Sequence, residues 1–97
     1  MKYQIRSTTR EEFESNFLKL RKLGFVYGNF RIKTLPELYQ YCAWQSYILI
    51  GYNPDCKLIL HGSLWQKSTL NWNLVTVDEF IENKWYEKIT LDVVFRA

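Results

Sequence analysis

Hydrophobic residues recur at two spacings along the chain, one typical of amphipathic helices and one typical of strands. The segments 9–23 and 77–85 repeat apolar residues at helical spacing, which predicts two main helices. Their apolar faces consist of Phe13, Phe17 and Leu20 in the first helix and Val77, Phe80 and Ile81 in the second. Each helix would bury this one face against another part of the fold.

Capping signals mark both ends of the first helix. Thr8 with Glu11, or Thr9 with Glu12, has the spacing of a capping box, in which the two side chains satisfy free backbone N–H groups. The two registers fit the sequence equally well. Gly24 follows the last turn and provides the left-handed stop that ends many helices.

Alternating or densely apolar runs predict strands near 2–7, 46–52, 57–62 and 88–96. The turn residues Asn53-Pro54-Asp55 join the second and third of these into a β-hairpin. A further strand over 25–33 is interrupted by Gly28, a short helix is expected over 34–42, and the polar segment 62–73 is expected to be a loop. The inner face of the short helix would consist of Leu35, Leu38, Tyr39 and Tyr41.

Together these elements predict an α+β fold in a single small domain over residues 1–97. We expect a mainly antiparallel sheet with the two main helices packed on one face, because each helix has one apolar face. A chain of 97 residues has no room for a second core. The expected core consists of Phe17, Leu20, Ile48, Ile50, Leu58, Leu60, Phe80 and Ile81.

Aromatic residues are unusually frequent, at 18% of the chain, whereas the hydrophobic and charged fractions are ordinary for a globular protein. A core of this size cannot easily bury six Phe, seven Tyr and four Trp side chains, so some of them should be exposed. Exposed Tyr and Trp often anchor binding surfaces, although the same rings can simply stabilise a small core. The aromatic surplus therefore favours a binding role without requiring one.

Basic residues are unevenly distributed. The net charge of +3 is too small to indicate nucleic-acid binding by itself. No acidic residue lies between Glu14 and Glu37, or between Asp55 and Asp78. Helix dipoles explain the acidic residues at helix starts, but they do not explain the basic residues within these two stretches. Those basic residues include Arg31, Lys33 and Lys67.

No set of residues suited to catalysis or to metal binding stands out. His61 is the only histidine and has no nucleophile motif beside it, and Cys42 and Cys56 have no close-spaced partner. The four glycines are too far apart to form a phosphate-binding loop. We therefore expect no enzyme activity and no cofactor. The absence of a signal-like or membrane-length apolar run predicts a cytoplasmic protein with no membrane partner.

Several motifs follow one another in a characteristic order. A first strand leads into a Thr-x-Glu-Glu helix that ends in Leu-Gly-Phe at 23–25, and a hairpin precedes Val-Thr-Val-Asp-Glu-Phe-Ile at 75–81. Over about residues 3–82 this order resembles small phage and prophage accessory proteins. The insertion at 34–44 and the strand after Trp85 depart from their pattern. The resemblance implies an inhibitor of a bacterial defence system, such as an anti-CRISPR protein, acting in the host bacterial cytosol.

Three functions fit these observations. The favoured one is a non-enzymatic accessory protein that binds and inhibits a bacterial host defence protein, for example in a nucleic-acid-handling complex. The alternatives are a nucleic-acid-binding module, in which basic residues follow phosphates and aromatic rings stack on bases, and a binder that sequesters a nucleotide. The small net charge disfavours the second, and the lack of a Gly-rich loop disfavours the third. A structural role in the phage and the oligomeric state both stay open.

The expected binding surface is centred on the polar segment between Trp65 and Trp72, which contains Lys67. Rigid rings next to adaptable polar side chains are common in protein-binding surfaces. Neighbouring irregular segments would add Trp44, Arg31 and Lys33. In the alternative interpretation, the tryptophan rings only cover an open face of the sheet and serve stability.

Overall fold

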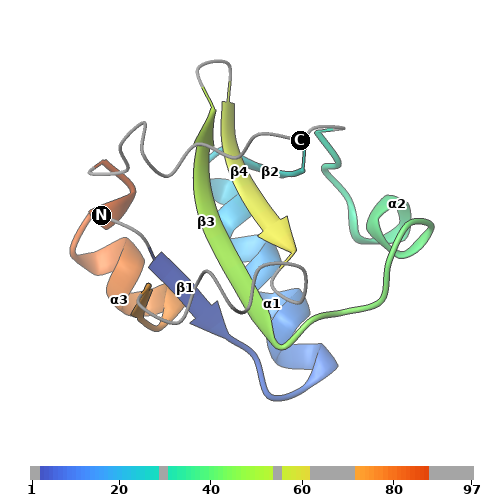
Figure 1. Cartoon of the computed structure of the whole chain (residues 1–97), viewed down its shortest axis with the longest axis horizontal. Helices are drawn as coiled ribbons and strands as arrows, with labels where there is room; N and C mark the ends of the chain where they lie inside the picture. Colours follow the sequence, from blue (N-terminus) through green and yellow to red (C-terminus); the bar gives the residue numbers. More distant parts are fainter. Residues whose placement is uncertain (1–2, 29–30, 54–55, 62–71, 88–97) are drawn as a thin grey trace.

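The computed structural model describes residues 3–28, 31–53, 56–61 and 72–87, and within 51–61 it describes the side chains of Lys57 and Ile59. The elements in chain order are β1 (Tyr3–Arg6), α1 (Arg10–Lys22), β2 (Phe25–Tyr27), α2 (Leu35–Tyr39), β3 (Tyr47–Asn53), β4 (Cys56–His61), β5 (Asn73–Leu74), α3 (Val77–Glu82) and the 3₁₀ turn η2 (Trp85–Glu87). Figure 1 shows β3 and β4 as a long hairpin with α1 running behind it.

The sheet has the strand order β2-β4-β3-β1-β5. Its three central strands are antiparallel, and the two short outer strands, β2 and β5, pair in parallel with their neighbours. This arrangement confirms the predicted α+β class and the mainly antiparallel sheet. Parallel pairing at both edges follows from the chain path, because a helix or a long connection separates each outer strand from its partner.

Both main helices cover the same face of the sheet. Tyr3 lies opposite Ile50 and Ile5 lies opposite Ile48, so these four side chains share one face. They form one buried cluster together with Phe17 and other residues of α1 and with Phe80 of α3. The ring of Phe80 contacts the edge of Tyr3, with centroids 5.4 Å apart. The core therefore lies between the sheet and a two-helix layer, as the sequence predicts.

The predicted core is largely confirmed. Five of its eight residues are fully buried, namely Phe17, Leu20, Ile48, Ile50 and Phe80. Ile81 is only half-buried at the margin of the cluster, because it follows Phe80 on the turning surface of a short helix. The side chains of Leu58 and Leu60 lie outside the described residues.

The N-cap of α1 decides between the two capping registers that fit the sequence. Thr9 is the N-cap of α1, and its hydroxyl accepts a hydrogen bond from the N–H of Glu12 at 3.1 Å. The Glu12 carboxylate in turn accepts from the N–H of Thr8 at 3.2 Å. At the other end of the helix, Gly24 has φ +93°, so the predicted left-handed stop is present.

Three elements differ from their predicted bounds. The helix α3 ends at Glu82, because the chain turns at Lys84 with φ 53° and continues as η2. The strand β2 has three residues, because Gly28 turns the chain and Ile32 bonds back to Tyr27. The helix α2 ends at Tyr39, so Tyr41 is 68% exposed instead of facing inward.

Strand β5 has no counterpart among the predicted strands. It consists of two residues that were expected to form the end of a loop and the lead into α3. The expected C-terminal strand at 88–96 and most of the expected loop at 62–73 lie outside the described residues. None of the helices in the described part of the chain has the length and apolar character that a membrane crossing requires.

Candidate binding surfaces

The structure describes four of the six residues that were expected to form one surface. Trp65 and Lys67 lie outside the described residues. Trp72 is half-buried beside β5, where its carbonyl oxygen accepts a hydrogen bond from Gln4 Nε2 at 3.2 Å. Arg31 and Lys33 are exposed beside β2, at the opposite edge of the sheet. The described members of the expected surface are therefore not brought together.

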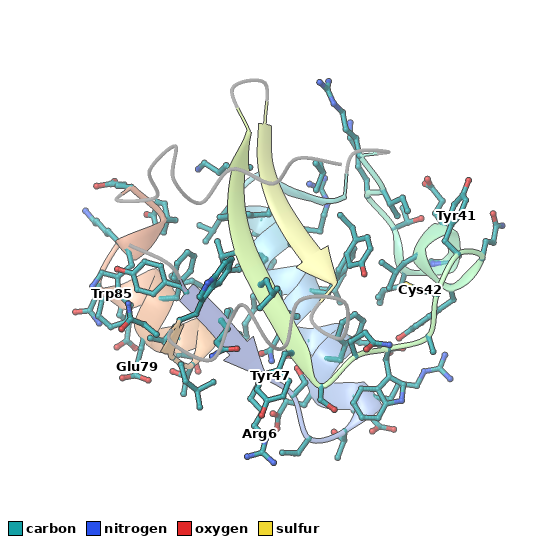
Figure 2. The ribbon with its side chains drawn as sticks, viewed as in Figure 1. Arg6, Tyr41, Cys42, Tyr47, Glu79 and Trp85 are labelled. Atoms are coloured by element: carbon teal, nitrogen blue, oxygen red, sulfur yellow. The ribbon has the colours of Figure 1, made fainter. Side chains whose placement is uncertain are left out.

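Trp44 belongs instead to a hollow of about 440 Å³ that we call the aromatic pocket. Its lining residues are Arg10, Tyr39, Gln40, Tyr41, Cys42, Ala43 and Trp44. They come from the first turn of α1, the end of α2 and the connection from α2 to β3. Trp44 is half-buried against the core, whereas Tyr41 projects from the end of α2, as Figure 2 shows.

One wall of the aromatic pocket is fixed by a charged network. Arg10 Nε bonds to Glu14 Oε2 at 3.0 Å, and its guanidinium lies 4.6 Å from the centre of the Tyr39 ring. The Tyr39 hydroxyl donates to the same Glu14 oxygen at 2.8 Å. The hydrogen bonds from Tyr39 and Arg10 lower the pKa of the Glu14 carboxyl. This wall of the aromatic pocket therefore consists of a tyrosine ring fixed by Glu14 and an arginine whose charge is balanced by Glu14.

Behind the aromatic pocket, Cys42 connects α2 to the sheet. Its thiol lies 3.8 Å from the Tyr27 hydroxyl and 3.7 Å from the Leu38 carbonyl oxygen. Burial, together with the neighbouring Cys42 thiol, raises the pKa of the Tyr27 phenol far above its usual value. The Tyr27 phenol is therefore held in its neutral form, and its contact with Cys42 supports the pocket wall.

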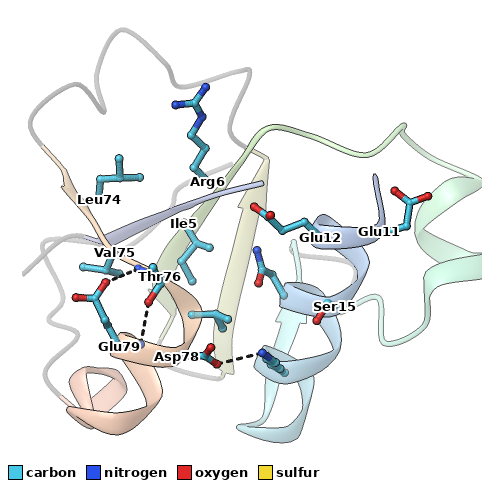
Figure 3. A pocket seen from close by; sticks show the side chains of 13 residues that line it. Ile5, Arg6, Glu11, Glu12, Ser15, Leu74, Val75, Thr76, Asp78 and Glu79 are labelled. Atoms are coloured by element: carbon cyan, nitrogen blue, oxygen red, sulfur yellow. Dashed lines mark hydrogen bonds and ion pairs between the residues drawn. The ribbon is translucent and has the colours of Figure 1, made fainter. Parts of the chain in front are cut away.

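A second hollow, the α1–α3 groove, has a volume of about 780 Å³ and opens between the two main helices (Figure 3). Its lining includes Ile5, Glu12, Asn16 and Lys19 on one side and Leu74, Thr76, Asp78 and Glu79 on the other. Lys19 Nζ and Asp78 Oδ1 are 3.0 Å apart, so an ion pair joins the helices across the groove. Glu79 completes a capping box with Thr76 at the start of α3.

The sequence predicts these surfaces only in part. The hypothesis named Trp44, but it placed Tyr39 and Tyr41 on the inner face of a helix. An available signal was the Arg10–Glu14 pair, whose i,i+4 spacing predicts contact on the surface of α1. No sequence pattern signals the α1–α3 groove, since its walls come from segments about sixty residues apart.

The described residues of the two hollows offer groups suited to binding. In the ranges that the structure describes, no group of three or more His, Cys, Asp and Glu side chains is arranged to hold a metal ion. Both hollows combine apolar side chains with hydrogen-bonding groups. No protein-family model matches this chain, and no curated protein or solved structure has significant similarity to it.

Proposed function

We propose that this chain is a non-catalytic binding protein that contacts a protein partner through the aromatic pocket. The observation that carries the proposal is the combination of an exposed Tyr41, a half-buried Trp44 and a held Tyr39 around one hollow. Tyr, Trp and Arg are the residue types that contribute most to protein–protein hot spots. Rings that are fixed before binding lose little conformational freedom in the complex, which favours affinity.

Charge favours a protein partner over a nucleic acid at this surface. The guanidinium of Arg10 already pairs with Glu14, so it is a poor partner for a phosphate. Among the described residues that line the pocket, Arg10 is the only basic one. Affinity for nucleic acids depends mainly on unpaired Lys and Arg side chains that displace counterions. A nucleic-acid-binding module is therefore the second choice here.

The resemblance to phage accessory proteins points to a bacterial host protein as the partner. We propose that binding inhibits a host defence protein in the bacterial cytoplasm, as an anti-CRISPR protein would, and that it needs no cofactor. This part of the proposal rests on the order of motifs along the chain and not on the geometry of the pocket.

Affinity capture from bacterial lysate, followed by mass spectrometry, would identify the partner. Purified partner would then be titrated against the wild-type chain and Tyr41→Ala. We expect Tyr41→Ala to weaken binding by about 1–2 kcal/mol or more at an unchanged melting temperature, because the exposed ring contributes little to the core. Leu18→Ala is the matched control, since it shortens another exposed apolar side chain outside both hollows.

Equal binding by the wild type and Tyr41→Ala would contradict the pocket as the contact surface. A shift on single-stranded DNA or RNA with steep salt dependence would favour the nucleic-acid module instead. His61→Ala separates binding from catalysis, and a folded variant should keep full activity. Loss of all activity in that variant would restore the enzyme hypothesis.

A further inference from the structure

The two edges of the sheet differ in how far their outward-facing backbone groups are already hydrogen-bonded by described residues. At the β2 edge, Arg21 Nη1 donates to the Phe25 carbonyl oxygen at 2.6 Å, and Arg21 Nε donates to the carbonyl oxygen of Lys33. The N–H and the carbonyl oxygen of Tyr27 both pair with Ile32, at 3.0 and 3.2 Å. These contacts occupy outward-facing backbone groups, so this edge is closed to another strand.

None of the described residues covers the opposite edge in full. The N–H of Ser7, just after β1, donates to the Ser46 carbonyl oxygen, so the backbone groups of Tyr3, Ile5 and Ser7 face β3. The N–H and C=O of Arg6 must then point outward. Strand β5 pairs with Tyr3 and Gln4 of β1, and it ends before it reaches Arg6. Among the described residues, no group satisfies the backbone of Arg6.

Leu74 extends the same open edge on β5. The N–H of Val75 donates to the Gln4 carbonyl oxygen, which places the backbone N–H and C=O of Leu74 on the side away from β1. The side chain of Leu74 is 57% exposed and lies on the face of the sheet opposite to Ile5. This edge therefore offers backbone hydrogen bonds next to an exposed apolar side chain.

The open edge borders the α1–α3 groove, as Figure 3 shows for Arg6 and Leu74. Inside the groove, the Asn16 side chain is only 7% exposed and donates to Ser7 Oγ at 3.0 Å. Within the described part of the chain, its Oδ1 has no hydrogen-bond partner. A buried amide oxygen without a partner is costly, so it favours a ligand that supplies a donor.

The charge of the groove favours a basic ligand. Glu11, Glu12, Asp78 and Glu79 line it, against two basic side chains, Arg6 and Lys19. Lys19 is already paired with Asp78. Glu12 and Glu79 each use one oxygen to cap a helix start, which leaves the other oxygen for a ligand. The groove thus has two more negative than positive side chains.

We propose that this edge and the α1–α3 groove bind an extended basic peptide segment of a partner protein, which adds to the sheet as a strand. In such complexes, main-chain hydrogen bonds provide affinity and alternate side chains provide specificity. The peptide would lie beside β5, on the side away from β1, and would bond to the outward groups of Leu74. Its basic side chains would face the groove and donate to its carboxylates and to Asn16, and its apolar side chains would contact Leu74.

Amide hydrogen exchange of the full chain tests the edge directly. In the free protein, the Arg6 and Leu74 amides should exchange rapidly while the Ile5 amide, which faces β3, is protected. The probe is the capped peptide Gly-Lys-Val-Lys-Val-Lys-Gly, added in excess. It should slow exchange at Leu74 by about tenfold or more. Protection of Leu74 already in the free monomeric chain would overturn the proposal, because the edge would then be covered by the chain itself.

Fluorescence anisotropy tests the chemistry of the site in two comparisons, one between two peptides and one between two protein variants. The lysine peptide should bind about tenfold more tightly than the matched peptide with Glu at each Lys position. The variant Glu12→Gln/Glu79→Gln keeps both caps, since Gln can replace Glu in a capping box, and should weaken binding by about three- to tenfold. The control variant Glu82→Gln/Glu87→Gln removes equal charge outside the groove and should leave peptide binding unchanged.

Leu74→Pro removes the outward N–H without touching the bonds between β1 and β5, so it should abolish peptide binding, whereas Leu74→Ala should only weaken it. Equal binding of both peptides, or unaffected binding by Leu74→Pro, would overturn the proposal. So would protection of Leu74 that appears only with dimerisation, since a second copy would then be the occupant. Tyr41→Ala should leave peptide binding intact, which keeps this test separate from that of the aromatic pocket.

Discussion

The ionisation of Tyr27 links pH to the stability of this fold. Its phenol lies against the Cys42 thiol at the edge of the core, and burial raises its pKa above the ordinary value of 10.0. The folded chain therefore holds the neutral phenol, whereas the unfolded chain ionises near pH 10. The stabilising contribution of neutral Tyr27 is complete below pH 10 and is lost as the pH rises above it.

We expect Tyr27→Phe to reduce the alkaline loss of stability. Above pH 10, wild-type stability should fall by up to about 1.4 kcal/mol per pH unit more than that of the variant. Urea titrations of both chains at pH 8 and pH 11 would measure the difference. Other tyrosines titrate in both proteins, so the comparison isolates Tyr27. Identical losses would show that its phenol reaches solvent in the folded state.

At the scale of elements, the capping pattern fixes where α1 begins. The hydroxyl of Thr9 accepts from the Glu12 N–H, whereas the Thr8 side chain is exposed and only its backbone N–H is used. We expect Thr9→Ala to lower the free energy of unfolding by about 0.5–2 kcal/mol. Thr8→Ala should change it by less than about 0.5 kcal/mol, since it removes no cap. Chemical denaturation of the two variants would measure both, and a larger effect at Thr8 would contradict this register.

Elements with local signals were predictable from the sequence, and elements that depend on distant contacts were not. The start of α1 and the hairpin of β3 and β4 follow from capping and turn residues that lie within a few positions of one another. Strand β5 exists because it reaches β1, about seventy residues earlier in the chain, and its two residues have no period of their own. The early end of α2 likewise leaves Tyr41 on the surface.

For the molecule as a whole, one buried cluster joins both main helices to the sheet. The fully buried Phe17 lies within this cluster. We expect Phe17→Ala to cost about 3–5 kcal/mol and to shift the unfolding midpoints of circular dichroism and tryptophan fluorescence together. Thermal unfolding followed by both probes would test this. Separate midpoints would show that the helices and the sheet do not unfold as one unit.

At this scale too, the sequence predicts the candidate binding surfaces only in part. A composition rich in aromatic residues predicted exposed rings, and Tyr41 and Trp44 fit that expectation. Their grouping with Arg10 depends on how α2 folds back over the first turn of α1, which no local pattern reports. Of the expected binding surface, Trp72 lies beside β5 whereas Arg31 and Lys33 lie beside β2, at the opposite edge of the sheet, which no local pattern reports either.

The closure of the β2 edge by Arg21 has a consequence for the behaviour of the protein at high concentration. A sheet with two open edges can pair with another copy at each edge. It then behaves like a bifunctional monomer in polymer chemistry, and such monomers grow into fibres. In the described part of this chain, the guanidinium of Arg21 and the return of Ile32 block one end. The molecule is then monofunctional, so edge-to-edge pairing stops at two copies and cannot propagate into a filament.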